Sequence, residues 1–260
     1  MKENIKNTKV FMLDLDGTVY LDGELIGDVI GTLNYFRDKG IKIVYLTNNS
    51  SGTDDAYYAK LKKMGIWDDR DIFYSSLDAA IDYLKANYPN KTVYPVATKS
   101  VSAHIAESGI KTGEKADIVL LTFDKELTYE KLVIANALIV KGALYISTHP
   151  DNTCPAKDVF IPDAGSFMSL LKTSSGKDPD IIIGKPYAVM ADMLAEKLGV
   201  DKTEITMVGD RLHTDIAFGK NNGLNTALVL SGETTLEFAK THPVKPDIIL
   251  NDINEFKSII

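Results

Sequence analysis

Short apolar runs alternate along the chain with segments of helical periodicity. Residues 9–15 and 41–47 are mainly apolar, which is typical of strands buried on both faces of a sheet. Between them, residues 28–40 repeat apolar positions at helical spacing and end on a glycine, a common helix stop. The alternation predicts βα units around a parallel sheet, which is the α/β class.

The same alternation continues to the end of the chain. We expect further strands at residues 71–76, 92–97, 116–123, 143–148, 179–185, 205–210, 225–230 and 247–250. We expect further helices at residues 55–65, 127–142, 187–199 and 214–223. The sequence shows neither an internal repeat nor a low-complexity tract that would suggest another architecture.

The middle of the chain, residues 77–180, has an α/β alternation of its own. A single crossover between parallel strands needs only about 30 residues, so this segment is too long to be one. Residues 172–180 are rich in Ser, Gly, Lys and Pro, as linkers are. We therefore expect a doubly wound parallel-sheet core of residues 1–76 and 181–260, with an inserted α/β domain of residues 77–180.

Composition and charge narrow the class of protein. Of the 260 residues, 45% are hydrophobic and 25% are charged, as in ordinary soluble proteins. Lys and Arg number 29 against 36 Asp and Glu, and this net charge of −7 argues against a nucleic-acid or anionic-membrane partner. The single cysteine, Cys154, cannot form a disulfide within the chain and suits a reducing compartment. The apolar stretch of residues 10–13 is too short for a signal peptide, so we expect a cytoplasmic protein.

Two aspartates, Asp14 and Asp16, interrupt the end of the first apolar run. Open α/β sheets bind ligands at the carboxyl ends of their strands, where this pair lies. One carboxylate could attack as a nucleophile while the other donates and accepts protons. Asp-Gly is also a common turn dipeptide, so the pair alone leaves its function open.

Polar residues also follow the second and a later strand. Thr47 and Asn48 offer a hydroxyl, an amide and the backbone N–H groups of a turn, which together can cradle phosphate oxygens. The same residue types are preferred helix caps, and this alternative is the more common one. Lys185 follows the apolar run of residues 181–183 and could neutralise an anionic substrate, although most such lysines are simply solvated.

Two more aspartates lie near the end of the strand expected at residues 205–210: Asp210 is its last residue, and Asp215 follows five residues later. Hard carboxylate oxygens suit Mg²⁺, which binds one or two carboxylates together with substrate phosphate. A turn at Asp210 and a helix cap at Asp215 would explain them equally well. The four sites are nevertheless expected on one edge of one sheet, and four aspartates gathered there would need a cation to offset their repulsion.

Four segments in this order resemble the motifs of the haloacid dehalogenase superfamily of phosphatases: "DLDGT", "LTNNS", "GKP" and "GDRLHTD". About 30 residues separate Asp16 from Thr47, whereas 138 separate Thr47 from Lys185. This spacing is similar to that of the branch with an α/β cap between the second and third motifs, the NagD and nitrophenyl-phosphatase group. The resemblance implies that residues 77–180 are such a cap.

The resemblance assigns roles to the aspartates. It implies that Asp14 is the nucleophile that forms an aspartyl-phosphate and that Asp16 is the general acid and base. It also implies an Mg²⁺ site formed by Asp14, the backbone carbonyl of Asp16, and Asp210, with Asp215 supporting the metal or its waters. Lys185 would take part in catalysis by balancing the charge on the transferring phosphoryl group.

Further roles concern phosphate binding and substrate choice. The resemblance implies that Thr47 and Asn48 hold the phosphoryl group together with Lys185. Residues 147–155, "STHPDNTCP", resemble the substrate-reading loop of the cap, with Thr148, His149 and Asp151 as candidate specificity residues. That loop commonly carries Asn where this chain has His149, so substrate preference does not transfer directly.

The sequence therefore predicts an Mg²⁺-dependent phosphatase for small phosphomonoesters such as sugar phosphates or nucleotides. A phosphotransferase of the same fold and a non-catalytic protein that binds phosphorylated ligands are the alternatives. The expected partner is a small phosphorylated metabolite, with neither nucleic acid nor membrane involved. The physiological substrate and the oligomeric state are open, with a homodimer formed through the cap as one option.

Overall fold

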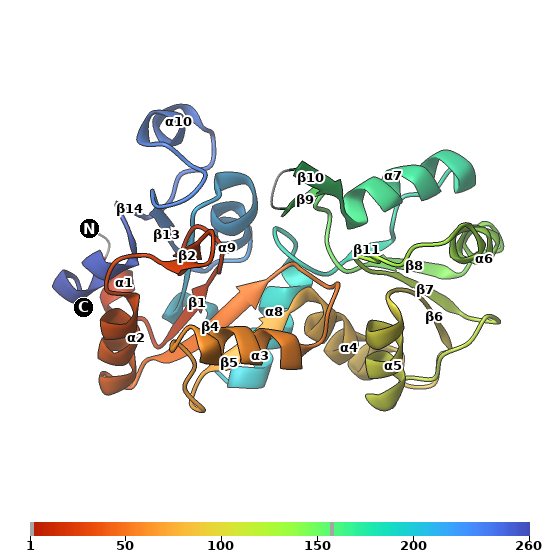
Figure 1. Ribbon diagram of the computed structural model, residues 1–260, viewed down its shortest axis with the longest axis horizontal. Coiled ribbons are helices and arrows are strands. Elements are labelled where there is room, and N and C mark those ends of the chain that lie inside the picture. Colours follow the sequence, from red (N-terminus) through yellow and green to blue (C-terminus); the bar gives the residue numbers. More distant parts are fainter. Residues whose placement is uncertain (1–2, 157–158) are drawn as a thin grey trace. The chain divides into compact units, whose positions relative to one another are not determined.

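The computed structural model describes residues 3–156 and 159–260, and within them two compact units can be distinguished (Figure 1). The core unit comprises the described residues up to Thr47, together with Asp54–Tyr74 and Lys185–Ile260. The inserted unit comprises Asn48–Thr53 and Ser75–Gly184. Each unit has its own sheet and its own covering helices.

The sheet of the core unit has six strands in the order β14-β13-β12-β1-β4-β5. The strands are β1 (Val10–Leu13), β4 (Lys42–Thr47), β5 (Ile72–Ser75), β12 (Ile205–Gly209), β13 (Asn225–Val229) and β14 (Ile248–Leu250). Strand β1 pairs in parallel with β4 on one side and with β12 on the other. The chain therefore changes direction across the sheet at β1, which is where open α/β sheets form a ligand site.

Strand β1 lies at the centre because all four of its residues are apolar and fully buried. Phe11 and Leu13 belong to the cluster on one face, where the Phe11 ring stacks on Phe36 with centroids 4.4 Å apart. Val10 and Met12 point to the opposite face and are equally buried. Cover on both faces explains the continuous apolar run in the sequence.

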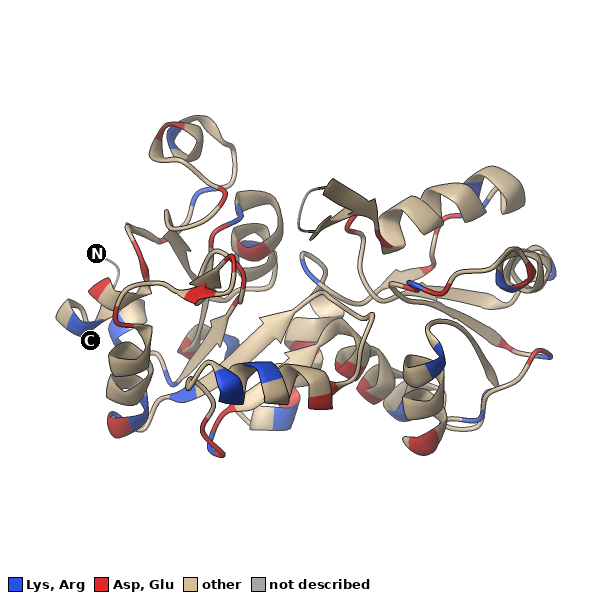
Figure 2. Cartoon of the chain, in the orientation of Figure 1, with Lys and Arg blue, Asp and Glu red and all other residues tan. Residues whose placement is uncertain are grey.

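Helices connect the strands of the core unit. They are α1 (Glu3–Lys6), α2 (Val29–Asp38), α3 (Asp54–Lys63), α8 (Ala188–Leu198), α9 (Ala217–Asn221) and α10 (Leu236–Thr241), with 3-10 turns at Lys202–Glu204 and Ile253–Ser258. A short hairpin of β2 (Tyr20–Leu21) and β3 (Glu24–Leu25) precedes α2. Helix α3 begins with two aspartates and ends with lysines, and this charge order complements the helix dipole (Figure 2).

The inserted unit has a four-stranded sheet in the order β11-β8-β7-β6. Its strands are β6 (Val93–Val96), β7 (Ile118–Leu121), β8 (Leu144–Ser147) and β11 (Ile181–Ile182), and they pair in parallel. Its helices are α4 (Ser76–Asn87), α5 (Lys99–Glu107), α6 (Tyr129–Val140) and α7 (Ala164–Ser175). An antiparallel hairpin of β9 (Thr153–Ala156) and β10 (Val159–Pro162) precedes α7. The α/β class, with a doubly wound core and an inserted α/β unit, is confirmed.

The strand expected at residues 179–185 forms, but in the other sheet. Ile181 pairs with Ile146 and Ile182 with Ser147, so β11 extends the sheet of the inserted unit. The sequence predicts residues 181–184 in the core. An apolar run indicates that a strand is buried but not which strand lies beside it, so the pattern could not decide between the two sheets.

Three local differences concern segments rich in small polar residues. Residues 172–180 were expected to be a linker, but α7 continues to Ser175, and the Thr173 hydroxyl donates to the Ser169 carbonyl at 2.9 Å. Such a bond within the helix accommodates a residue that otherwise favours loops. The helix expected at residues 214–223 begins earlier, as a π-helical turn at Leu212–Ile216 that leads into α9. The segment Asn48–Thr53 packs with the inserted unit.

In the described ranges, 3–156 and 159–260, every helix is either too short or too polar to cross a lipid bilayer.

Candidate active site

Three of the expected site residues lie at the carboxyl ends of adjacent strands. Asp14 follows β1, Asp210 follows β12, and Thr47 is the last residue of β4. The backbone N–H of Asp14 donates to the Val208 carbonyl at 3.0 Å, which continues the pairing of β1 with β12. The sheet register therefore holds Asp14 and Asp210 on neighbouring strands at the same edge.

Lys185 lies between two carboxylates. Its Nζ is 2.5 Å from Asp14 Oδ1 and 2.7 Å from Asp215 Oδ1, and its side chain is only 4% exposed. Burial alone would lower the pKa of Lys185, but Asp14 and Asp215 outweigh this effect and raise it above the ordinary value. The amine is therefore held as a cation that neutralises part of the acidic group.

Lys185 is carried by a different part of the fold from the one that the sequence predicts. The sequence predicts Lys185 at the end of a strand in the same sheet as Asp14, but β11 belongs to the sheet of the inserted unit. Lys185 is instead the first residue of the last core segment and precedes α8. The expectation that all four motifs end strands on one edge is therefore wrong for Lys185, although its side chain does join the aspartates.

Asp14, Asp210 and Asp215 form a compact acidic group. One oxygen from each lies within 4.8 Å of the others. Burial, with the charge of Asp215, raises the pKa of Asp14 to about 7 against the opposing effect of Lys185. Burial and the charge of Asp14 raise the pKa of Asp210 to about 6. Three crowded carboxylates, two of them buried and that of Asp14 partly buried, resist ionisation unless further positive charge is supplied.

The oxygens of Asp210 have unequal surroundings. Oδ2 accepts a hydrogen bond from the Glu233 backbone N–H at 2.7 Å, whereas Oδ1 is buried without a hydrogen-bond partner among the described residues. A buried carboxylate oxygen is costly without a partner. Because Asp14 lies in the same group, the donor set fits a divalent cation that prefers oxygen ligands.

Glycines allow the backbone to approach these carboxylates closely. A Cβ on Gly17 or on Gly232 would collide with the carboxylate of Asp210, and one on Gly209 would collide with Asp215. The Ser231 hydroxyl donates to the Gly17 carbonyl at 2.7 Å and ties the β1 loop to the β13 loop. The contribution of residues 231–233 was not predicted from the sequence, although their position directly after a buried strand could have indicated it.

Arg211 lies within the fourth motif, "GDRLHTD", and the sequence predicts no role for it. Its backbone N–H donates to Asp215 Oδ2 at 3.2 Å, and its Nε lies 3.0 Å from Glu233 Oε2. Burial would lower the pKa of Arg211, but the carboxylates of Asp14, Asp210 and Glu233 raise it. Arg211 is therefore a second cation beside the acidic group.

Asp16 has different surroundings from Asp14. It is solvent-exposed, and the Tyr20 hydroxyl donates to its Oδ2 at 3.4 Å. Lys60 Nζ in turn donates to the Tyr20 hydroxyl at 2.7 Å. The protein atoms packed around the carboxyl raise the pKa of Asp16, with Lys60 and Tyr20 acting in the opposite direction. The two aspartates thus differ in exposure and in charge partners.

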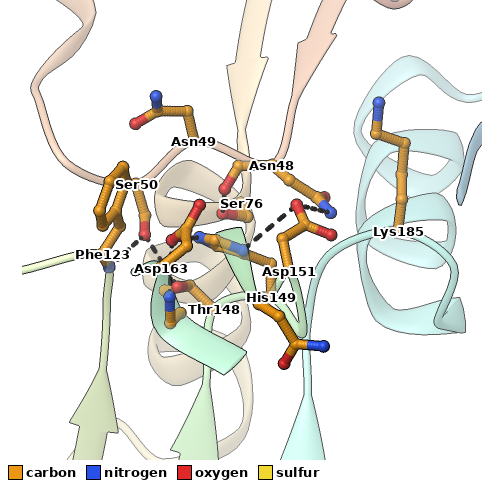
Figure 3. Close-up of polar contacts among 12 residues, drawn as sticks. Asn48, Asn49, Ser50, Ser76, Phe123, Thr148, His149, Asp151, Asp163 and Lys185 are labelled. Atoms are coloured by element: carbon orange, nitrogen blue, oxygen red, sulfur yellow. Dashed lines mark hydrogen bonds and ion pairs between the residues drawn. The ribbon is translucent and has the colours of Figure 1, made fainter. Parts of the chain in front are cut away.

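The remaining candidates meet within the inserted unit. The Asn48 side-chain amide donates to Asp151 Oδ2 at 3.0 Å, and the Ser50 and Thr148 hydroxyls lie 2.9 Å apart (Figure 3). Thr148 and His149 are fully buried. Burial does not favour direct reading of a substrate by His149, so its assignment as a specificity residue stays a prediction without structural support.

Comparisons with known proteins agree with this geometry. A family model described as haloacid dehalogenase-like hydrolase matches residues 11–111, and one described as HAD-hydrolase-like matches residues 182–256. An acid sugar phosphatase of Staphylococcus aureus is 36% identical over 253 residues, which cover 96% of this chain and 97% of that protein.

Solved structures extend the similarity to the whole fold. A 4-nitrophenylphosphatase from Thermotoga maritima has a TM-score of 0.94 and 37% identity, and 99% of each chain is covered. A putative NagD protein has a TM-score of 0.90 and 36% identity over 100% of this chain and 99% of that one. The chain is therefore an enzyme that belongs to the haloacid dehalogenase-like hydrolases, and within them to the NagD-like phosphatases.

Proposed function

We propose that this enzyme is an Mg²⁺-dependent phosphatase that hydrolyses small sugar phosphates through a phosphoaspartate on Asp14. The observation that carries the proposal is the buried group in which Lys185 contacts both Asp14 and Asp215 beside an unpartnered oxygen of Asp210. The names of the relatives, an acid sugar phosphatase and a 4-nitrophenylphosphatase, support sugar phosphates as the substrate class and aryl phosphates as convenient probes.

Asp14 is the proposed nucleophile. A carboxylate is a weak nucleophile toward an anionic phosphoryl group, so nearby positive charge is needed. Lys185 supplies this charge at 2.5 Å and holds the orientation of the carboxylate. Asp215 accepts the second hydrogen bond from Lys185 and so keeps the amine in place.

Asp14 and Asp210 would hold the metal, with the Asp16 carbonyl as a third oxygen donor and Asp215 in support. When bound, Mg²⁺ would neutralise charge on the carboxylates and on the phosphoryl oxygens. The hydrogen bond from Glu233 fixes the Asp210 carboxylate and leaves its Oδ1 available as a ligand.

Asp16 is the proposed proton donor and acceptor. Its exposure suits exchange of protons with a leaving alcohol and with water, and Tyr20 fixes one of its oxygens. As Asp14 bonds to phosphorus, the bond to the leaving oxygen breaks, and Asp16 gives that oxygen a proton. Asp16 then accepts a proton from the water that cleaves the acyl phosphate and regenerates Asp14.

Thr47 and Asn48 are the proposed phosphate-binding residues, and the inserted unit is proposed to select the leaving group. A small phosphorylated metabolite is the proposed partner. The cytoplasm is the proposed location, on the basis of the single cysteine. The proposal is the same for a monomer and for a homodimer.

The test measures phosphate release from 4-nitrophenyl phosphate and from a panel of sugar phosphates, with Mg²⁺ or with EDTA. We expect turnover with Mg²⁺ and its loss with EDTA. Turnover that is insensitive to EDTA would overturn the metal role. An added acceptor alcohol distinguishes the phosphotransferase alternative, because a transferase would form a new phosphate ester, and tight binding without release would indicate a non-catalytic protein.

A further inference from the structure

The loop after β8 encloses a histidine that the proposed reaction does not use. His149 follows Thr148 in this loop, and its side chain has no exposed surface. Both ring nitrogens are buried and have no hydrogen-bond partner in the part of the chain that the structure describes. Because buried polar atoms are normally paired, this arrangement needs an explanation.

Each ring nitrogen faces a carboxylate. Nδ1 is 3.4 Å from Asp151 Oδ2, and Nε2 is 3.4 Å from Asp163 Oδ1, as Figure 3 shows. A neutral imidazole donates from one nitrogen only, whereas an imidazolium donates from both. While both carboxyl groups are ionised, only the protonated ring can donate to both, each through a small adjustment of angle and distance.

Charged side chains surround this position. Asp163 is only 4% exposed, and burial raises its pKa, while His149 lowers it. Asp151 repels Asp163, and Lys125, between β7 and α6, attracts it. His149 thus lies between two acidic groups, one on its own loop and one at the start of α7.

These carboxylates flank the base of the β9–β10 hairpin. The Asp163 N–H donates to the Asn152 carbonyl at 3.0 Å, and the Gly165 N–H donates to the Asp151 carbonyl at 2.8 Å. Asp151 also accepts the Asn48 amide at 3.0 Å. The His149 imidazole therefore lies beside both ends of the hairpin. Asp151 lies between this imidazole and the side chain of Asn48, a proposed phosphate-binding residue.

We propose that His149 is a positioning residue that, when protonated, bridges Asp151 and Asp163, closes the base of the β9–β10 hairpin and orients the Asn48 amide. When the ring loses its proton, one carboxylate loses its donor and the two acidic groups face a neutral ring, which loosens the base. The link to substrate binding rests on the proposed role of Asn48, whereas the effect on the hairpin is independent of that role.

Amide hydrogen exchange tests the bridge directly. From about pH 5.5 to about pH 8, protection of the Asp163 and Gly165 amides should fall in the wild type, because the bridge needs the protonated ring. Loss of a hydrogen bond to a charged group predicts a fall of about tenfold. His149→Asn should give low protection at both pH values.

Two further variants control the experiment. His104→Asn removes an imidazole from α5 in the same unit and should keep the pH dependence of the wild type. Asp163→Asn keeps a side-chain oxygen at the start of α7 but removes one carboxylate, so its pH dependence should shrink. Wild-type protection that does not change with pH, or a His149→Asn variant that keeps the dependence, would overturn the proposal.

Kinetics separate the bridge from its effect on the substrate. With a sugar phosphate, the KM of His149→Asn should exceed that of the wild type about tenfold near pH 5.5 and match it near pH 8, with a smaller change in kcat. A general packing defect would raise KM at both pH values and would count against the proposal. If the exchange result holds but KM is unchanged, the bridge is supported and the link through Asn48 is overturned.

Discussion

At the scale of single residues, the site depends on how charges are paired. Asp14 and Asp16 are one residue apart, yet Asp14 contacts buried Lys185 while Asp16 is exposed and contacts Tyr20. The sequence marked both aspartates and Lys185 as candidate site residues. It could not indicate the burial of His149 between Asp151 and Asp163, because those contacts join residues whose neighbourhood depends on the fold.

Replacement of the proposed nucleophile should abolish activity without unfolding the protein. Asp14→Asn removes one of three crowded carboxylates, and Lys185 keeps Asp215 as a partner. We expect kcat to fall by at least about 10⁴, as for other nucleophiles, while the melting temperature does not decrease. Phosphate release and thermal unfolding measure the two effects. Asp22→Asn, on the nearby hairpin, is the matched control, and wild-type turnover by Asp14→Asn would refute the assignment.

Asp16→Asn should affect catalysis alone. Because Asp16 is exposed and its hydrogen bond to Tyr20 is long, we expect little change in stability. The loss of general acid and base catalysis should lower kcat by about 10²–10⁴. In Asp16→Asn, the first step should be faster with substrates that have better leaving groups, so that part of the lost rate is recovered. An Asp16→Asn variant as fast as the wild type would show that another group transfers the proton.

At the scale of elements, the sequence predicted most strands but not their neighbours. The apolar runs located β1, β4 and β12, because strands buried on both faces leave a strong pattern. The partner of β11 was not predictable, because Ile181 and Ile182 would suit either sheet. The β9–β10 hairpin was missed, since its residues are largely exposed and show no apolar alternation.

The loop after β1 should tolerate no side chain at Gly17. This glycine has φ +83°, and a Cβ there would meet the Asp210 carboxylate. Gly23 is a matched control, because it has φ +86° and open space around its Cβ position. Both alanine variants incur a backbone cost of about 1–2 kcal/mol. Only Gly17→Ala should also raise the Mg²⁺ concentration needed for half-maximal activity, and equal behaviour of the two variants would contradict this prediction.

At the scale of the whole molecule, the acidic group should make stability depend on pH and on metal. The folded-state pKa values of Asp14, about 7, and of Asp210, about 6, lie above the ordinary value of 3.8. Between these values the folded protein binds more protons than the unfolded protein does. The contribution of the group to the free energy of unfolding therefore falls as the pH rises from about 4 to about 7.

Mg²⁺ should reverse this loss. A cation that binds only the folded protein stabilises it, and its affinity increases as the carboxylates ionise. We expect the difference in melting temperature between Mg²⁺ and EDTA to be small near pH 5 and to grow toward pH 7.5. Because the melting temperatures with Mg²⁺ and with EDTA are compared at the same pH, the titration of groups outside the site affects both equally and cancels. In Asp210→Asn the difference should be small throughout, and a metal effect that shrinks with rising pH would contradict the proposed ligands.

The central claim is that Asp14 accepts the phosphoryl group in a metal-assisted reaction. Acid quenching of enzyme mixed with a sugar phosphate and Mg²⁺, followed by peptide mass spectrometry, tests it most directly. We predict one added phosphoryl group on the peptide that contains Asp14. This phosphoryl group should be absent with EDTA and in Asp14→Asn. A phosphoryl group on any other residue, or phosphate release by Asp14→Asn at the wild-type rate, would contradict it.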